Sequence, residues 1–150
     1  MTRCLILFDG DDFEISEKIK RHISNFGVIV DANVNSADDV GLGENIDDFI
    51  SSMIETCDCV IYMFSANTDI EKMISLSKIK PTYALYVSDV AEFVIEYIEK
   101  EPGIIITPKK SILEIGWHKG ISLAMQQIFG KKADRKHRLK IILLWIPRPY

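Results

Sequence analysis

The segment Val60-Ile-Tyr-Met-Phe64 is apolar at every position, and the polar stretch Ser65-Ala-Asn-Thr-Asp69 follows it directly. An apolar run without alternation is typical of a strand at the centre of a parallel sheet, where helices cover both faces. The polar residues after it are typical of a turn that leads into a helix. This stretch therefore indicates a parallel α/β fold.

The same pattern of an apolar run followed by a helical segment recurs along the chain. Four further apolar runs predict strands at residues 5–8, 28–30, 83–87 and 104–106. Apolar residues at helical spacing predict helices within residues 15–26, 46–54, 70–79, 90–97 and 117–129. Because alternating strands and helices build right-handed βαβ units, we expect a flavodoxin-like three-layer fold with a five-stranded parallel sheet. Residues 33–43 are predicted to form an exposed loop, and Ser88-Asp89 to cap the helix that follows.

The charge divides the chain into two parts. It has 150 residues, 47% of them hydrophobic, which suits one domain with a core. Residues 1–130 carry 11 Lys/Arg and 21 Asp/Glu, whereas residues 131–150 carry seven Lys/Arg and one Asp. We therefore predict a domain at 1–130 and a basic, partly apolar C-terminal tail at 131–150. The acidic domain would repel a phosphate backbone, so no nucleic acid is expected as a partner, and the tail is expected to contact protein in preference to an acidic membrane.

The cysteine content and the apolar runs bear on the compartment. Three cysteines, Cys4, Cys57 and Cys59, are too few for a disulfide framework and are expected to be reduced thiols. The longest apolar run, Ile141-Ile-Leu-Leu-Trp-Ile146, is shorter than the roughly 20 residues of a membrane-spanning helix. Because no signal peptide is visible either, we expect a cytoplasmic protein.

Three carboxylates follow the first predicted strand, at Asp9, Asp11 and Asp12. They could hold Mg²⁺, as in the receiver domains of phosphorelays, or one of them could cap the next helix. A receiver domain also needs an acceptor Asp at the end of the third strand, where this chain has Ser65. We favour the helix cap and expect no metal and no resident cofactor.

Glu71 lies just inside the helix that follows the third strand, and Ser65 and Asn67 precede it. A carboxylate at this edge of the sheet could stabilise an oxocarbenium-like centre of a sugar or hold one of its hydroxyls. It could equally interact with the positive end of its own helix. The spacing leaves both interpretations open and favours the interaction with the helix end.

Taken together, these segments resemble a TIR (Toll/interleukin-1 receptor) domain over roughly residues 3–130. Four stretches are similar to family motifs: Leu5-Ile-Leu-Phe-Asp-Gly-Asp-Asp12, Asp38-Asp-Val-Gly-Leu-Gly-Glu-Asn-Ile46, Cys57-Asp-Cys-Val-Ile-Tyr-Met-Phe-Ser65 with Asn67, and Gly116-Trp117. Their order and spacing carry the resemblance more than any one of them does.

The resemblance implies one of two functions in an immune or antiviral defence pathway. The first is signalling by self-association or by contact with another TIR domain. The resemblance implies the following interaction residues: Asp38, Asp39, Gly41, Gly43 and Trp117. The second function is cleavage of NAD⁺ at the nicotinamide–ribose bond, with Glu71 as the catalytic acid. The residues implied for NAD⁺ binding are Asp9, Gly10, Asp11, Ser65 and Asn67.

The chain departs from the enzymatic TIR pattern in one segment. The family's Trp-Cys-x-x-Glu motif is absent, and Ser77 stands where its glutamate would fall. We therefore expect signalling first and NAD⁺ cleavage as the alternative. A third, weaker interpretation is a receiver-like domain that binds partners without phosphate.

Overall fold

A computed structural model describes residues 2–9, 13–23, 28–36, 46–130 and 138–146. Its strands are β1 (Thr2–Asp9), β2 (Val28–Ser36), β3 (Cys59–Phe64), β4 (Thr82–Tyr86), β5 (Ile104–Thr107) and β6 (Arg138–Ile146). Its helices are α1 (Phe13–Ile23), α2 (Ile46–Thr56), α3 (Ile70–Ser77), α4 (Glu92–Glu99), α5 (Ile112–Ile115) and α6 (Trp117–Phe129). The alternation of strands and helices confirms the predicted α/β class.

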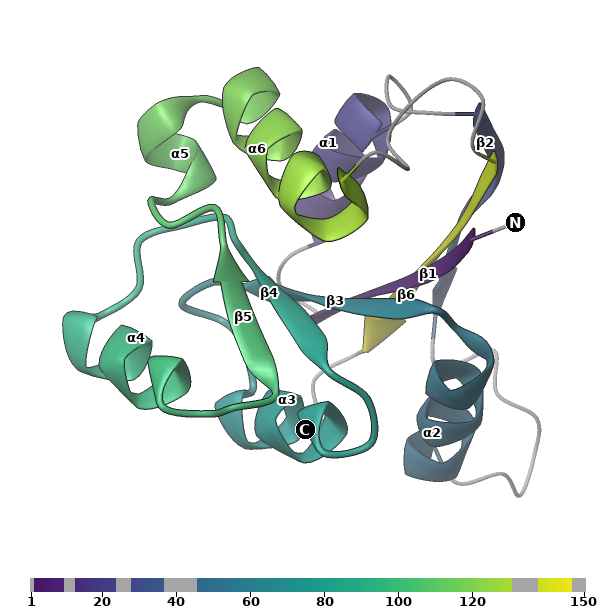
Figure 1. Cartoon of the computed structure of the whole chain (residues 1–150), viewed down its shortest axis with the longest axis horizontal. Helices are drawn as coiled ribbons and strands as arrows, with labels where there is room; N and C mark the ends of the chain where they lie inside the picture. Colours follow the sequence, from purple (N-terminus) through teal and green to yellow (C-terminus); the bar gives the residue numbers. More distant parts are fainter. Residues whose placement is uncertain (1, 10–12, 24–27, 37–45, 131–137, 147–150) are drawn as a thin grey trace.

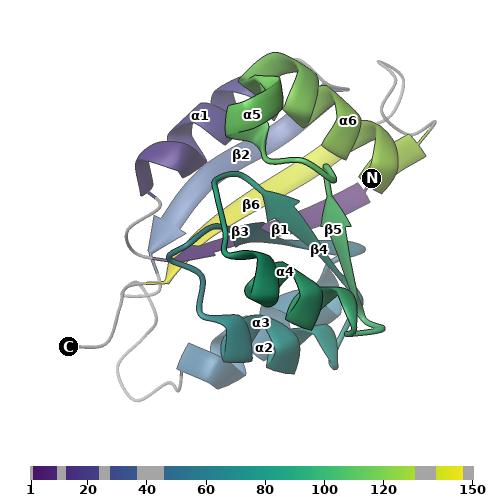
Figure 2. The same ribbon diagram turned by 90° about the vertical axis from the view of Figure 1, so that its left-hand side faces the viewer.

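All strand pairs in the sheet are parallel, and the strand order is β2-β6-β1-β3-β4-β5. Figures 1 and 2 show that α1, α5 and α6 cover one face, and α2, α3 and α4 cover the other. β3 lies between β1 and β4, and five of its six residues are buried. The apolar segment 60–64 predicted a strand at the centre of the sheet, and β3 lies there.

The predicted number of five strands is wrong, because the C-terminal segment supplies a sixth. β6 pairs with β1 from Thr2↔Leu139 to Asp9↔Ile146 and with β2 on its other side. The segment we expected to be a tail outside the domain thus contains a strand inside the sheet. Its apolar run, Ile141-Ile-Leu-Leu-Trp-Ile146, has the same pattern as β3.

Two local predictions also need correction. β2 continues to Ser36, so residues 33–36 are strand and not loop, and residues 37–43 lie outside the described part of the chain. Helix α4 begins at Glu92 after the N-cap Ala91, so Ser88-Asp89 does not cap it. Gly116, at φ 99°, separates the short α5 from α6, since the left-handed region that favours glycine ends one helix and redirects the chain.

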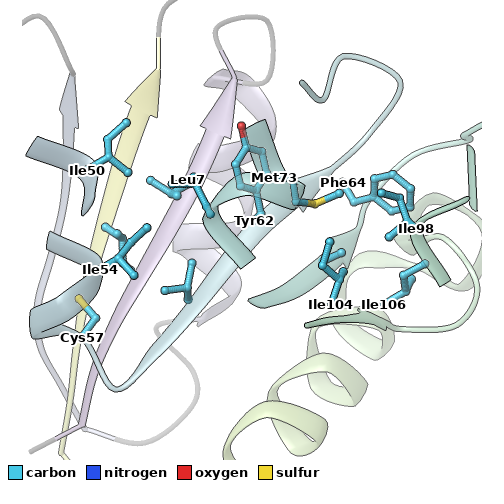
Figure 3. Close-up of a cluster of buried hydrophobic side chains, with 14 of the residues drawn as sticks. Leu7, Ile50, Ile54, Cys57, Tyr62, Phe64, Met73, Ile98, Ile104 and Ile106 are labelled. Atoms are coloured by element: carbon cyan, nitrogen blue, oxygen red, sulfur yellow. The ribbon is translucent and has the colours of Figure 1, made fainter. Parts of the chain in front are cut away.

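The core consists of two apolar clusters, one on each face of the sheet. On the first face, side chains of β1, β3 and β4 pack against α1, α5 and α6, and Ile6, Met63 and Ile121 are among its fully buried members. The second cluster packs beneath α2, α3 and α4, and Figure 3 shows it. Its labelled members are Leu7, Ile50, Ile54, Cys57, Tyr62, Phe64, Met73, Ile98, Ile104 and Ile106. None of the helices in the described ranges has the length and hydrophobicity that a bilayer-spanning segment requires.

Candidate functional site

The chain reverses its direction across the sheet between β1 and β3. From β1 it runs to β2 on one side of the sheet, whereas from β3 it runs to β4 on the other side. The helices that leave these two strands, α1 and α3, lie on opposite faces (Figure 1). In open parallel sheets, ligands bind at the carboxyl ends of strands at such a point. The ends of β1 and β3 are therefore the candidate site.

Asp9, the last residue of β1, holds this edge together. Only 5% of it is exposed, and its carboxylate accepts hydrogen bonds from the Tyr62 hydroxyl at 3.2 and 3.3 Å. The backbone N–H of Asp69 donates to the same carboxylate at 3.0 Å. A buried carboxylate needs such donors because removing it from water costs several kcal/mol. Asp9 thus joins β1 to β3 and to the start of α3, and Figure 3 shows the Tyr62 oxygen at the far end of its side chain.

The turn between β3 and α3 is ordered by its own hydroxyl groups. Thr68 Oγ1 accepts from the Ser65 N–H and donates to the Met63 carbonyl, both at 2.8 Å. The hydroxyl oxygen of Ser65, which is buried, accepts from the Asn67 N–H at 3.1 Å. These bonds satisfy backbone groups that a tight turn would otherwise leave without a partner. Ser65 and Thr68 therefore shape the turn, and the exposed Asn67 lies at its outer side.

Glu71 lies in the first turn of α3 and is exposed. Asp69 is the N-cap of this helix, and its side chain accepts from the Lys72 N–H at 3.1 Å. Acidic residues at a helix N-terminus interact favourably with the helix dipole. The Glu71 side chain is thus accessible to solvent. It follows, by two residues, Asp69, whose backbone N–H donates to the Asp9 carboxylate.

Ser65 and Asn67 lie in the turn between β3 and α3, and Glu71 lies in the first turn of α3. Asp9 is joined to this turn by the bond from the N–H of Asp69, the N-cap of α3. The other residues implied for NAD⁺ binding, Gly10 and Asp11, lie outside the described residues, as do Asp12 and the interaction residues Asp38, Asp39, Gly41 and Gly43. In the part of the chain that the structure describes, no three His, Cys, Asp or Glu side chains gather as metal ligands would.

Tyr62 is the participant that sequence reasoning missed. It counted only as an apolar position of β3, although its ring is fully buried and its hydroxyl bonds Asp9. The available signal was the chemistry of tyrosine, whose hydroxyl usually has a hydrogen-bond partner when the ring is buried. The neighbouring strand end offered Asp9 as that partner.

Trp117, an implied interaction residue, contacts α1 in this structure. Its ring stacks on His22 with centroids 6.2 Å apart and planes 11° apart, and Lys18 Nζ lies 5.5 Å from the ring centroid. A cation over an indole face is attracted by the ring quadrupole. Trp117 is therefore held between α6 and α1 and is half-buried.

The thiols lie near the amino-terminal ends of β1 and β3, away from the candidate site at the carboxyl ends. Cys4 and Cys59 are register partners on β1 and β3, and all three cysteines are free. A hydrogen bond with Cys59, together with burial, raises the pKa of the Cys4 thiol well above its ordinary value. Burial raises the pKa of Cys57 as well. Because thiols react as thiolates, Cys4 and Cys57 are poor nucleophiles here.

Comparisons with known protein families, with curated proteins and with solved structures gave no match to this chain.

Proposed function

We propose that this chain is a TIR-like domain that signals by associating with copies of itself or with other TIR-like domains. The strand order supports the proposal: without β6 it is β2-β1-β3-β4-β5, which is the flavodoxin-like order. Among the described residues of the motifs that resemble the TIR family, Leu5–Asp9 lies in β1, Cys57–Ser65 includes β3, and Gly116-Trp117 lies at the start of α6.

One observation carries the proposal over an enzymatic function. Phe93 and Tyr97, four residues apart on α4, are 75% and 55% exposed. Side chains at this spacing lie on the same helix face, so the two rings form one exposed aromatic patch. Aromatic residues are enriched among those that carry binding energy at protein interfaces. The hydrogen bonds of Asp9 and Ser65, by contrast, serve the turn itself.

Self-association is tested by sedimentation velocity of the full chain over a wide range of concentrations. We expect the weight-average sedimentation coefficient to rise with concentration. A protein that stays monomeric at high concentration and binds no TIR-like partner contradicts the proposal.

The alternative function, cleavage of NAD⁺ at the nicotinamide–ribose bond, is favoured by a separate observation. Glu71 offers an exposed carboxylate at the start of α3, beside the point where open sheets bind ligands. Such a carboxylate can stabilise the positive charge that develops on the ribose as nicotinamide leaves. NAD⁺ would be a substrate here and not a resident cofactor.

The assay for this alternative measures nicotinamide release at high protein concentration or under crowding, where an assembly would form. Glu71→Gln is compared with Glu55→Gln, a matched change of an exposed acid on α2, which belongs to the same helix layer. Release that only Glu71→Gln abolishes would establish the enzyme. No release from the assembled wild type would exclude it.

A further inference from the structure

The two helix layers carry opposite charge. Residues 46–101, which include α2, α3 and α4, contain eleven Asp/Glu and four Lys, a formal net charge of −7. Residues 13–23 and 109–130, which include α1, α5 and α6, contain three Glu and six Lys/Arg, a net charge of +3. Since the sheet separates these layers (Figure 2), the described part of the molecule has an acidic side and a basic side.

The acidic side bears the aromatic patch. Phe93 and Tyr97 are accompanied on α4 by exposed Glu92 and Glu96, and Glu99 follows at the end of the helix. In Figure 1, α4 lies at the outer edge of its layer, beside β5. A partner that approaches α4 thus meets two large apolar rings bordered by carboxylates.

The basic side bears the complementary groups. On α6, Lys119 and Leu123 are four residues apart and both are exposed, Leu123 by 47%. Leu113 on α5 is 55% exposed, and Lys109 and Lys110, just before α5, are exposed too. This surface therefore offers apolar side chains bordered by ammonium groups, the reverse in charge of the α4 surface.

We propose that the α4 surface of one molecule binds the α5–α6 surface of a second copy. The inference deepens the proposed function and rests on it, since it names the two surfaces through which the chain associates. The occupant is a second copy because the same chain carries both complementary surfaces, one on each side of its sheet. After two molecules have bound, one still has an unoccupied α4 surface and the other an unoccupied α5–α6 surface. Further copies can bind to both in the same way, so the contact is head-to-tail and repeats.

Two variants, each changed in only one of the two surfaces, test this pairing. Phe93→Ser/Tyr97→Ser removes the patch on α4 and leaves α6 intact, whereas Lys119→Glu/Leu123→Ser changes α6 and leaves α4 intact. All four positions are exposed, so both variants are expected to fold, which circular dichroism and thermal unfolding would verify. Ile79→Ser, which changes an exposed apolar residue beyond the end of α3, is the matched control.

We expect each variant alone to lose association by about tenfold or more in dissociation constant, and Ile79→Ser to match the wild type. Mixing the two variants at equal concentration should form a dimer that grows no further, because each supplies the surface that the other lacks. Wild-type association should weaken as salt rises, since opposite charges at a surface are screened.

Other outcomes overturn the pairing. If the α6 variant still forms dimers alone, α4 contacts α4 and the head-to-tail contact is wrong. If the wild type associates and both variants match it, another surface is used, and the inference fails while the proposed function stands. If the wild type does not associate with itself or with another TIR-like domain, the proposed function fails with it.

Discussion

Replacing Tyr62 with Phe isolates the hydrogen bond that joins β3 to the end of β1. The ring is fully buried and would stay in place, but the Asp9 carboxylate would lose the donor that lies 3.2 and 3.3 Å from its oxygens. A hydrogen bond to a charged group contributes about 1.5–3 kcal/mol. We therefore expect the free energy of unfolding to fall by about 2 kcal/mol and the melting temperature by about 4–8 °C.

Urea unfolding of Tyr62→Phe, Asp9→Ala and the double variant measures this bond directly. The coupling free energy from the cycle should be about 1–2 kcal/mol, because the two side chains interact with each other. Tyr97→Phe removes the same hydroxyl from an exposed ring and should change stability by less than about 0.5 kcal/mol. A loss below about 0.5 kcal/mol in Tyr62→Phe, or a coupling near zero, would show that Tyr62 does not hold the Asp9 carboxylate.

Two further changes test the packing of α5 against α6 and the state of the buried thiol. Gly120→Ala should lower the unfolding free energy in urea, because its Cβ would lie 2.8 Å from Ile112 Cγ1 and the overpacking, about 1–3 kcal/mol, exceeds the roughly 1 kcal/mol that alanine gains in a helix; increased stability would contradict that close approach. For Cys4, the raised pKa means that the folded state keeps its proton above the ordinary value of 9.0 while the unfolded state releases it. The stability that the Cys4 thiol contributes is therefore present below pH 9.0 and is lost as the pH rises above it. The free energy of unfolding that Cys4→Ala loses relative to the wild type at about pH 7 should thus become smaller toward pH 10. A deficit independent of pH would contradict the raised pKa.

The strands that the sequence predicted best are those whose burial is uniform. Val60-Ile-Tyr-Met-Phe64 is apolar throughout because both faces of β3 are covered, and the pattern alone was enough to place it centrally. Residues 141–146 have the same pattern, but the seven basic residues among the last twenty are typical of a tail. Charged residues beside an apolar run indicate a solvent-exposed surface near the ends of a strand. Whether the strand pairs within a sheet depends on the apolar run itself.

β2 shows a second reason for error. Val30, Ala32 and Val34 alternate with Asp31 and Asn33, which is the period of a strand with two unlike faces. The polar residues from Asn33 onward, with Gly41 and Gly43 after them, are typical of a loop. Among the strands that the structure describes, β2 lies at the edge of the sheet and pairs with β6 alone. That neighbour lies more than one hundred residues away, so no local pattern identified it.

The candidate site was predictable in its location but not in its bonding. Strand ends in a parallel sheet meet at one edge, so the sequence was able to place Asp9 near Ser65. It could not show that the Asp69 N–H would point at Asp9, because that depends on how the turn of residues 65–69 folds. The carboxylate of Asp9, which the resemblance implies for NAD⁺ binding, accepts hydrogen bonds from Tyr62 and from the Asp69 N–H.

The place of β6 also constrains how the chain can be made. During synthesis on a ribosome, residues 28–36 emerge about one hundred residues before the strand that separates them from β1. Until then, β1 has no parallel neighbour on that side, and β2 cannot join the sheet in its final register. Since pairing between distant segments slows folding, we expect closure of this half of the sheet to be a late step of folding.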